Sequence, residues 1–316
     1  MALDPVNFEK PYTKQLEGVC AVLKSTPPGS DGQRRLTPGY PAMTATVVNL
    51  PIPVVSYANW FSYVTDDFVS QNWQVYRAIR TTRALFPEMS LHFVGDSELD
   101  DQKVFEQVAS VRGHFTFRVK HPERRVEVYN ERLDRWEEEI LGDLVATVPL
   151  TAEMKVTFSH ARRIRRVKVE LGWLKIRLPD KLQPLWIVVV HDPDLDRELV
   201  LVTSIEITRS ATAREVYTQW RYRPQIEHTY RFDQEDGLDV EDVRVRTLER
   251  MRRHPFAPFA FICSSWFYLP LCSSTRSEQS GPSKSSPGCA TSAASSASTP
   301  TAMAPISSSP ASALSS

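Results

Sequence analysis

Residues 89–110 read "MSLHFVGDSELDDQKVFEQVAS" and combine three local patterns. The apolar run at 91–95 predicts a short strand, the acidic residues after it predict a turn, and the segment from 102 onward predicts a helix. A strand that leads through a turn into a helix is typical of a mixed sheet flanked by helices. Asp96 stands where this strand ends, and open α/β sheets bind ligands at strand ends. The stretch therefore predicts an α/β fold with Asp96 at a crevice.

The flanking segments continue this alternation. Residues 41–64 are rich in β-branched and aromatic residues around "NLPIP", which predicts a strand pair, and "HFTFRVKHP" at 114–122 predicts another strand. We expect residues 1–124 to form the first part of the core.

One helix before the opening stretch is predicted from its period. Residues 70–86 place Val75, Ile79 and Leu85 near one face of a helix, and Ser70 precedes them as a candidate N-cap.

The pattern changes in the middle of the chain. Residues 125–208 contain successive strand-like runs, which predict a β-rich insertion interrupted at most by a helix at 130–141. Residues 209–254 are then strongly helical, with breaks expected at Pro224 and near Gly237.

The end of the chain has a different composition. Residues 273–316 hold 17 serines in 44 positions and no aromatic residue, too little apolar surface to offset the entropy of ordering. We expect 255–316 to be a low-complexity, disordered tail. The abrupt change is typical either of translation in a wrong reading frame or of a natural disordered tail.

Charge and cysteine content exclude some classes of protein. The 38 basic and 38 acidic residues balance, but basic residues gather at 118–125, 160–168 and 244–253, and such patches can face phosphate. The four cysteines show no zinc-binding spacing. The start is not a signal peptide, and prolines interrupt the apolar run at 255–272, so we expect no membrane span and a cytoplasmic protein.

Three carboxylates occupy suggestive positions: Asp4 near the start, Asp96 at a strand end and Glu227 on the late helical segment. Converging acids supply the oxygen ligands that divalent cations prefer, and a pair of such cations promotes phosphodiester chemistry. The alternatives are ordinary ones: a turn residue for Asp4, a helix cap for Asp96, and a partnered or surface charge for Glu227.

The same residues carry a resemblance to a known family. Trp220, Arg223, Glu227 and Gln234 have the spacing of a Tyr-x2-Arg-x3-Glu-x6-Lys signature, in which the Arg and the Glu match. "ALDPVNFEKPY", "LHFVGDSELDD" and "FRVKHPERR" resemble the strand segments of the same family. The chain thus resembles the DDE transposases of bacterial insertion sequences over roughly residues 1–254.

This resemblance implies a ribonuclease-H-like fold with a β-rich insertion before the last catalytic helix. It implies that Asp4, Asp96 and Glu227 are the catalytic residues and ligate two Mg²⁺ or Mn²⁺ ions. It also implies cleavage and strand transfer at transposon ends by a dimer on DNA. Because the chain begins at the first Asp strand and turns serine-rich after the Glu helix, we expect a defective copy that lacks both flanking regions.

Candidate DNA contacts come from two places. In the family the signature Tyr and Lys contact phosphate near the active site, so the resemblance assigns this role to the positions of Trp220 and Gln234, while Arg223 keeps a bidentate donor. The basic run "HARRIRRVKV" adds a second candidate surface, or else simply forms an exposed strand face; its arginines are Arg162, Arg163, Arg165 and Arg166.

Two hypotheses on function follow. The first is a metal-dependent transposase, favoured by the three retained acids. The second is a non-catalytic remnant that only binds DNA, favoured by the replaced Tyr and Lys.

Overall fold

The structure is a computed structural model of the whole chain. It describes residues 1–12, 15–24, 32–50, 53–160, 163–193, 198–227 and 247–253. All of these belong to one compact unit, Met1–Cys272. The predicted break near Gly237 and the predicted tail at 255–316 lie outside the described residues.

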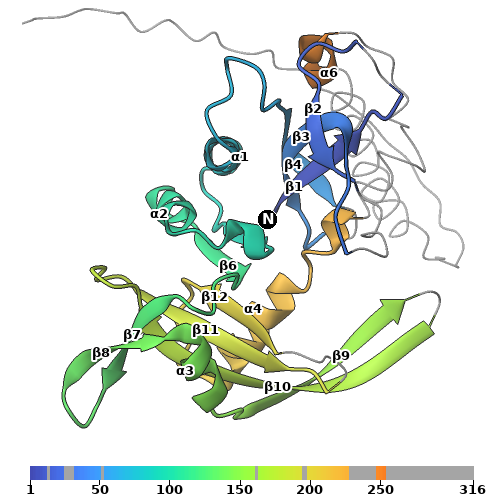
Figure 1. Cartoon of the computed structure of the whole chain (residues 1–316). Helices are drawn as coiled ribbons and strands as arrows, with labels where there is room; N and C mark the ends of the chain where they lie inside the picture. The colour runs from blue at the N-terminus through green and yellow to red at the C-terminus, as the bar shows by residue number, and fades with distance from the viewer. Residues whose placement is uncertain are drawn as a thin grey trace, which may run out of the picture. The chain divides into compact units, whose positions relative to one another are not determined.

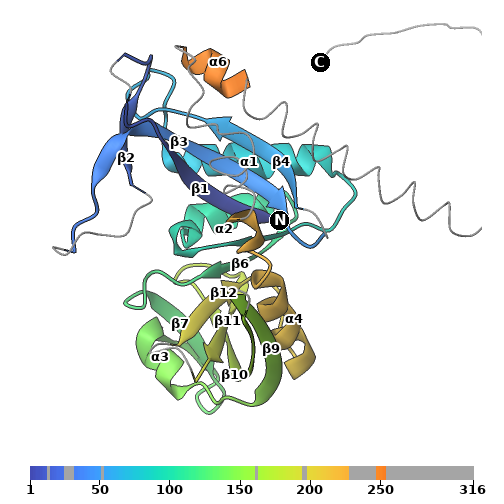
Figure 2. The same ribbon diagram turned by 90° about the vertical axis from the view of Figure 1, so that its right-hand side faces the viewer.

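The described strands form one large, mostly antiparallel sheet, and few helices accompany it (Figures 1 and 2). The strands are β1 (Ala2–Glu9), β2 (Cys20–Leu23), β3 (Leu36–Val47), β4 (Val54–Trp60), β5 (His92–Gly95), β6 (His114–Arg118), β7 (Arg125–Asn130), β8 (Arg135–Ile140), β9 (Ala152–His160), β10 (Arg163–Arg177), β11 (Pro184–His191) and β12 (Leu199–Thr203). The helices are α1 (Gln71–Leu85), the 3₁₀ helix η1 (Ser97–Leu99), α2 (Gln102–Ser110), α3 (Leu141–Thr147), α4 (Ser210–Trp220) and α6 (Leu248–Arg253).

The strand order positions the candidate site. It runs β2-β3-β1-β5-β6-β12-β11-β10-β7-β8, with β4 paired to β3 and β9 paired to β10. Among the described pairs, only β1 with β5 and β5 with β6 are parallel. The prediction of a mixed α/β fold is therefore confirmed.

The opening stretch folds as its pattern predicts. It forms β5, the short helix η1 and α2, whose N-cap Asp101 accepts a hydrogen bond from the amide of Lys103 (2.7 Å). The preceding helix α1 is capped by Ser70, whose hydroxyl accepts from the amide of Trp73 (3.1 Å). Both caps satisfy amides that a helix start leaves without partners.

The predicted apolar face of α1 is correct for two of its three residues. Val75 and Ile79 are buried, but Leu85 is 55 % exposed. At about 100° per residue, Leu85 lies between the buried residues Gln74 and Ala78 around the helix, so its face is the expected one. It is exposed because it is the last residue of α1, where the helix reaches the edge of the core.

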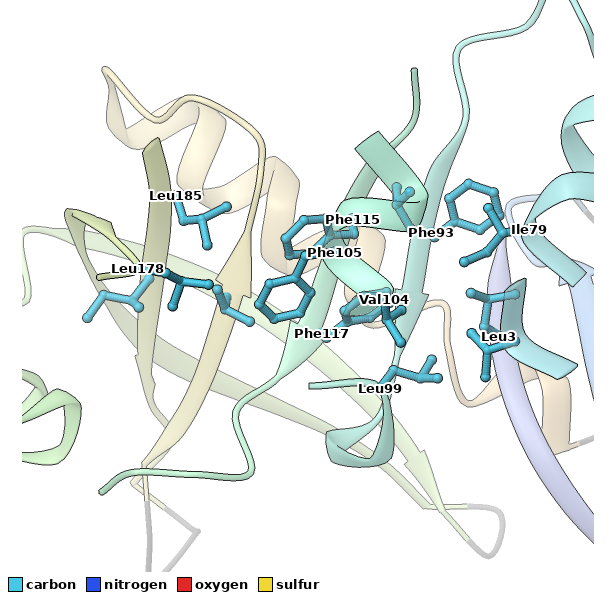
Figure 3. Close-up of a cluster of buried hydrophobic side chains, with 14 of the residues drawn as sticks. Leu3, Ile79, Phe93, Leu99, Val104, Phe105, Phe115, Phe117, Leu178 and Leu185 are labelled. Atoms are coloured by element: carbon cyan, nitrogen blue, oxygen red, sulfur yellow. The ribbon is translucent and has the colours of Figure 1, made fainter. Parts of the chain in front are cut away.

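A continuous apolar core joins the first part of the chain to the strands after residue 125. Figure 3 shows it extending from Leu3 of β1 through Phe93, Phe105, Phe115 and Phe117 to Leu178 and Leu185. Phe105 and Phe115 stack there with ring centroids 4.4 Å apart. The change of pattern at residue 125 is therefore not a break in the core.

The opposite face of β10 packs against α4. Val167, Val169 and Leu171 alternate along β10 and form a second cluster with Val216 and Tyr217 of α4. This packing fixes α4, whose end leads to Arg223 and Glu227.

The helix that the sequence allowed at 130–141 does not form. This range forms the turn and second strand of the β7–β8 hairpin, in which Tyr129 lies opposite Trp136 with ring centroids 5.6 Å apart. The side-chain oxygen of Asn130 accepts the amide of Arg132 (3.0 Å) and so closes the turn. The short helix α3, just after the hairpin, is a further correction, because the sequence predicted a strand-like run there.

Among the described residues, no helix is both long and apolar enough to cross a membrane.

Candidate acidic site

Strand register brings the first two acids together. In the parallel pair of β1 and β5, Ala2 lies opposite Val94, so Asp4 and Asp96 fall at the same level two residues further on. The hydroxyl of Thr44, from the other neighbouring strand, donates to the main-chain oxygen of Asp4 (3.1 Å) and steadies this part of β1.

Arg223 joins these acids to the third. Its Nη2 lies 3.1 Å from Oδ1 of Asp4 and 3.6 Å from Oδ2 of Asp96, and its Nη1 lies 3.0 Å from Oε1 of Glu227. The chain turns at 221–224 and becomes helical again at 225–227, which places Glu227 on the same side as Arg223. The three predicted acids therefore lie around one guanidinium group.

The four side chains form a gradient from buried to exposed. The side chains of Asp4 and Arg223 are 12 % and 16 % exposed, whereas those of Asp96 and Glu227 are 36 % and 60 % exposed. Asp4 and Arg223 thus form the buried base of the cluster, and Glu227 lies at its solvent side.

Burial dominates the electrostatics of this base. It raises the pKa of Asp4 to about 6, although the charge of Arg223 and its hydrogen bond act in the other direction. Burial also opposes the charge on Arg223, but the surrounding carboxylates together raise the pKa of its guanidinium above the usual value. The guanidinium is therefore the cation that balances a poorly solvated acid.

Asp96 has a second function in the fold. Its Oδ1 accepts the amide of Ser97 (2.7 Å) and caps the helix η1, while its Oδ2 faces Arg223. Asp96 is therefore both a helix cap, through Oδ1, and a member of the acidic cluster, through Oδ2.

Trp220 lies beside this group as a structural residue. Its indole Nε1 donates to the main-chain oxygen of Gly95 (3.0 Å), directly before Asp96. The half-buried ring also packs at the edge of the cluster formed by α4 and β10. Trp220 therefore fixes the end of β5 to the end of α4, and its contact with DNA stays a prediction.

The side-chain chemistry of the three acids suits a divalent metal ion, but their arrangement in this structure does not. Three carboxylates are ligands that Mg²⁺ or Mn²⁺ accepts. Within the described ranges, however, no group of three or more His, Cys, Asp or Glu side chains is arranged to hold a metal ion. The acids point at the guanidinium of Arg223 that lies between them, so in this arrangement their partner is a side chain of the protein itself.

The second predicted DNA surface is only partly described. Arg165 and Arg166 are exposed near the loop end of the β9–β10 hairpin, on opposite faces of the strand. Arg162 and Gln234 lie outside the described residues, and Arg163 is placed only as the first residue of β10.

A hydrogen bond connects this hairpin to the acidic cluster. Nη2 of Arg221 donates to the main-chain oxygen of Thr157 on β9 (2.7 Å). Arg221 precedes Arg223 by two residues and belongs to the same turn. The basic hairpin is thus anchored to the turn that carries Arg223.

The sequence did not single out His92, at the start of β5. Its Nε2 lies 2.8 Å from Oγ1 of Thr116, and its Nδ1 is hydrogen-bonded to Oε1 of Gln219 on α4. Burial lowers the pKa of His92 to about 4, so its imidazole is neutral at pH 7. The hydroxyl of Thr116 continues the network to Thr203 (2.9 Å). The sequence signal that could have identified His92 is a polar residue at the start of an otherwise apolar strand.

A pocket of about 530 Å³ adjoins His92, with Gln219 and Tyr222 among its lining residues. It is lined by neither Asp4 nor Asp96. This pocket and the acidic cluster are therefore different features.

No protein-family model matches the chain, and no curated protein matches it. The resemblance to DDE transposases rests on the residues and spacings quoted from the sequence.

Proposed function

We propose that this chain is the catalytic domain of a DDE-type DNA transposase with a ribonuclease-H-like fold. The observation that carries the proposal is the convergence of Asp4, Asp96 and Glu227 on Arg223. These acids come from three distant parts of the chain, and the resemblance selected the same three from the sequence alone.

The topology supports the proposed fold. Asp4 and Asp96 lie level on neighbouring parallel strands, so one edge of the sheet presents both acids. The strands β7 to β12 all lie in the sequence between the second acid and the third, where the family carries its β-rich insertion.

The proposed chemistry is phosphodiester cleavage followed by strand transfer. Two bound Mg²⁺ or Mn²⁺ ions would activate the attacking hydroxyl and stabilise the leaving oxygen. In this chain Asp4, Asp96 and Glu227 would supply the oxygen ligands, and Arg223 would hold a phosphate through two parallel hydrogen bonds. The partners are transposon-end and target DNA, met by a dimer in the cytoplasm.

The basic hairpin gives the DNA a path toward the acids. Arg165 and Arg166 are exposed on β10, and Arg221 ties the neighbouring strand to the turn that carries Arg223. DNA that contacts the hairpin would therefore pass near this turn. Such contacts depend on phosphate charge and weaken as salt concentration rises.

A second candidate function is DNA binding without catalysis. The specific observation in its favour is that Arg223 occupies the space between the acids, where a metal ion would be needed. Gln234, which replaces the signature Lys, also removes a charge from the proposed phosphate contacts.

Cleavage of labelled DNA separates the two candidates. The purified full chain is incubated with Mn²⁺ and a duplex carrying the genomic borders of its gene, beside Asp96→Asn and the control Asp143→Asn, an exposed acid of α3. We expect Mn²⁺-dependent nicking by the wild type and the control, and a rate about a hundredfold lower for Asp96→Asn. DNA binding without nicking by the wild type would favour the second candidate.

A further inference from the structure

The acidic cluster already contains a cation. The guanidinium of Arg223 contacts one oxygen of each acid, through Nη2 for Asp4 and Asp96 and through Nη1 for Glu227. Three carboxylates and one guanidinium leave a formal charge of −2 when all the acids are ionised. The cluster is therefore balanced only in part, and it keeps an attraction for further positive charge.

A metal ion and this guanidinium need the same oxygen atoms. The acids form no metal-ligating group while they are turned toward Arg223. Asp4 is too buried to stay ionised without a neighbouring cation, because an uncompensated buried charge is strongly destabilising. One cation can therefore replace another in the cluster, but a cluster without any cation would make the folded protein much less stable.

The surroundings of Arg223 suit such an exchange. Arg223 lies in the turn at 221–224, so its side chain can move without a shift of α4. Its buried Nε has no hydrogen-bond partner among the described residues. Among the described residues, its polar contacts are thus made by its two terminal nitrogens, and a phosphate would offer Nε an acceptor as well.

We propose that Arg223 is an exchangeable counter-ion of the acidic cluster. It holds Asp4, Asp96 and Glu227 together while no metal is bound, and it leaves them when a divalent cation enters. The released guanidinium then binds a DNA phosphate. This inference rests on the proposed function, and it predicts that metal and DNA phosphate each favour binding of the other.

The test measures Mn²⁺ binding by calorimetry, without DNA, on the full chain at pH 7.5. Arg223→Gln removes the competing charge and keeps a side chain that can donate hydrogen bonds. We expect it to bind Mn²⁺ about tenfold more tightly than the wild type, because one unit of competing charge leaves the site. Arg253→Gln, outside the cluster in the exposed pair with Glu249, serves as the control and is expected to match the wild type.

A second variant and a second readout guard against a folding defect. Arg223→Lys keeps the charge but has a single ammonium group, so it should hold fewer carboxylates and give an intermediate Mn²⁺ affinity. Thermal unfolding should show a lower midpoint for Arg223→Gln than for the wild type. Millimolar Mn²⁺ should raise that midpoint more in the variant than in the wild type.

The outcomes separate this inference from the proposed function. Equal Mn²⁺ affinity in the wild type and Arg223→Gln, or tighter binding by the wild type, overturns the exchange and leaves the metal site in place. No Mn²⁺ binding by either protein overturns the metal site itself and the exchange with it.

Discussion

The two ends of strand β5 are attached to the same segment of chain by different chemistry. At its start, His92 is neutral and bonded to Gln219 and Thr116. Directly after its end, Asp96 is an acid whose partner is the guanidinium of Arg223. One end is closed by neutral hydrogen bonds, and the other is held by charges that do not cancel.

This difference separates stability from chemistry. The hydrogen bonds of His92, Gln219 and Thr116 are made within the protein, so their contribution is to hold α4 against β5 and β6. A cluster with residual negative charge attracts cations, which the proposed reaction requires. We expect substitutions at the two ends to differ in their dependence on pH and on divalent metal.

The largest effect is expected for Arg223→Ala. It leaves the buried Asp4 without its cation, and removal of one partner from a buried ion pair costs about 3–5 kcal/mol. Urea unfolding at pH 7.5 without divalent metal measures this loss. The exposed control Arg253→Ala should leave the unfolding midpoint unchanged. Equal midpoints for the two variants would show that the base of the cluster is not a buried pair.

The pH dependence of that loss sharpens the comparison. The pKa of Asp4 is about 6 in the folded chain and 3.8 in its ordinary state, so the folded protein binds this proton more tightly. Stability from Asp4 is therefore greatest at low pH and is lost as pH rises from about 3.8 to about 6. At pH 5 Asp4 is largely neutral, and Arg223→Ala should be less damaging than at pH 7.5.

The second prediction concerns His92, at the start of β5, where stability depends on pH in the opposite direction to that at Asp4. His92 has a folded pKa of about 4 against an ordinary 6.5, so the unfolded chain takes up the proton first. Stability from His92 is full above pH 6.5 and falls by about 3 kcal/mol as pH decreases toward 4. Urea unfolding across this range should show the loss in the wild type and not in His92→Gln.

Other titrating groups lie near His92, so the comparison uses the difference between the two proteins. His114 and the amino group of Met1 face the same region, and Asp4 contributes with opposite sign. All of these remain in His92→Gln. Parallel pH profiles for the two proteins would show that the imidazole is not buried in its neutral form.

The third prediction tests the link between the two ends. Trp220→Phe keeps an aromatic ring but removes the donor to the main-chain oxygen of Gly95. We expect a loss of about 1–2 kcal/mol, since an unpaired buried acceptor carries this cost. Mn²⁺ affinity should fall a fewfold because Asp96 follows Gly95. The control is Trp73→Phe, at a residue of α1 that is 40 % exposed. If both substitutions changed Mn²⁺ affinity equally, Trp220 would have no role in positioning Asp96.

Local patterns predicted much of the fold around this site. The strand, turn and helix at 89–110 and the helix capped by Ser70 form as expected, because period and capping are decided by residues close in sequence. The prediction of a helix at 130–141 failed because the glutamates of this segment favour a helix locally. Cross-strand pairs such as Tyr129 with Trp136 stabilise a hairpin instead.

The candidate site also has a part that local sequence patterns predicted and a part that they did not. The acids were found from their positions at a strand end and in a spaced signature, and the structure brings them together. The place of Arg223 between them depends on contacts over more than two hundred residues, which no local pattern contains. The network of His92 was missed for the same reason, since its partners lie on β6 and α4.

The smallest effect on stability, and the sharpest contrast with Arg223→Ala, is expected for Glu227→Gln. The carboxylate of Glu227 is 60 % exposed, and an ion pair so accessible to water contributes at most about 0.5 kcal/mol. Urea unfolding should therefore barely change. If Glu227 ligates metal, however, the same substitution removes a charged ligand, so Mn²⁺ binding and DNA nicking should fall together by about tenfold or more. A large loss of stability would make the cluster a structural ion network. Unchanged nicking would take Glu227 out of the site, leaving Asp4 and Asp96 as the acids that matter.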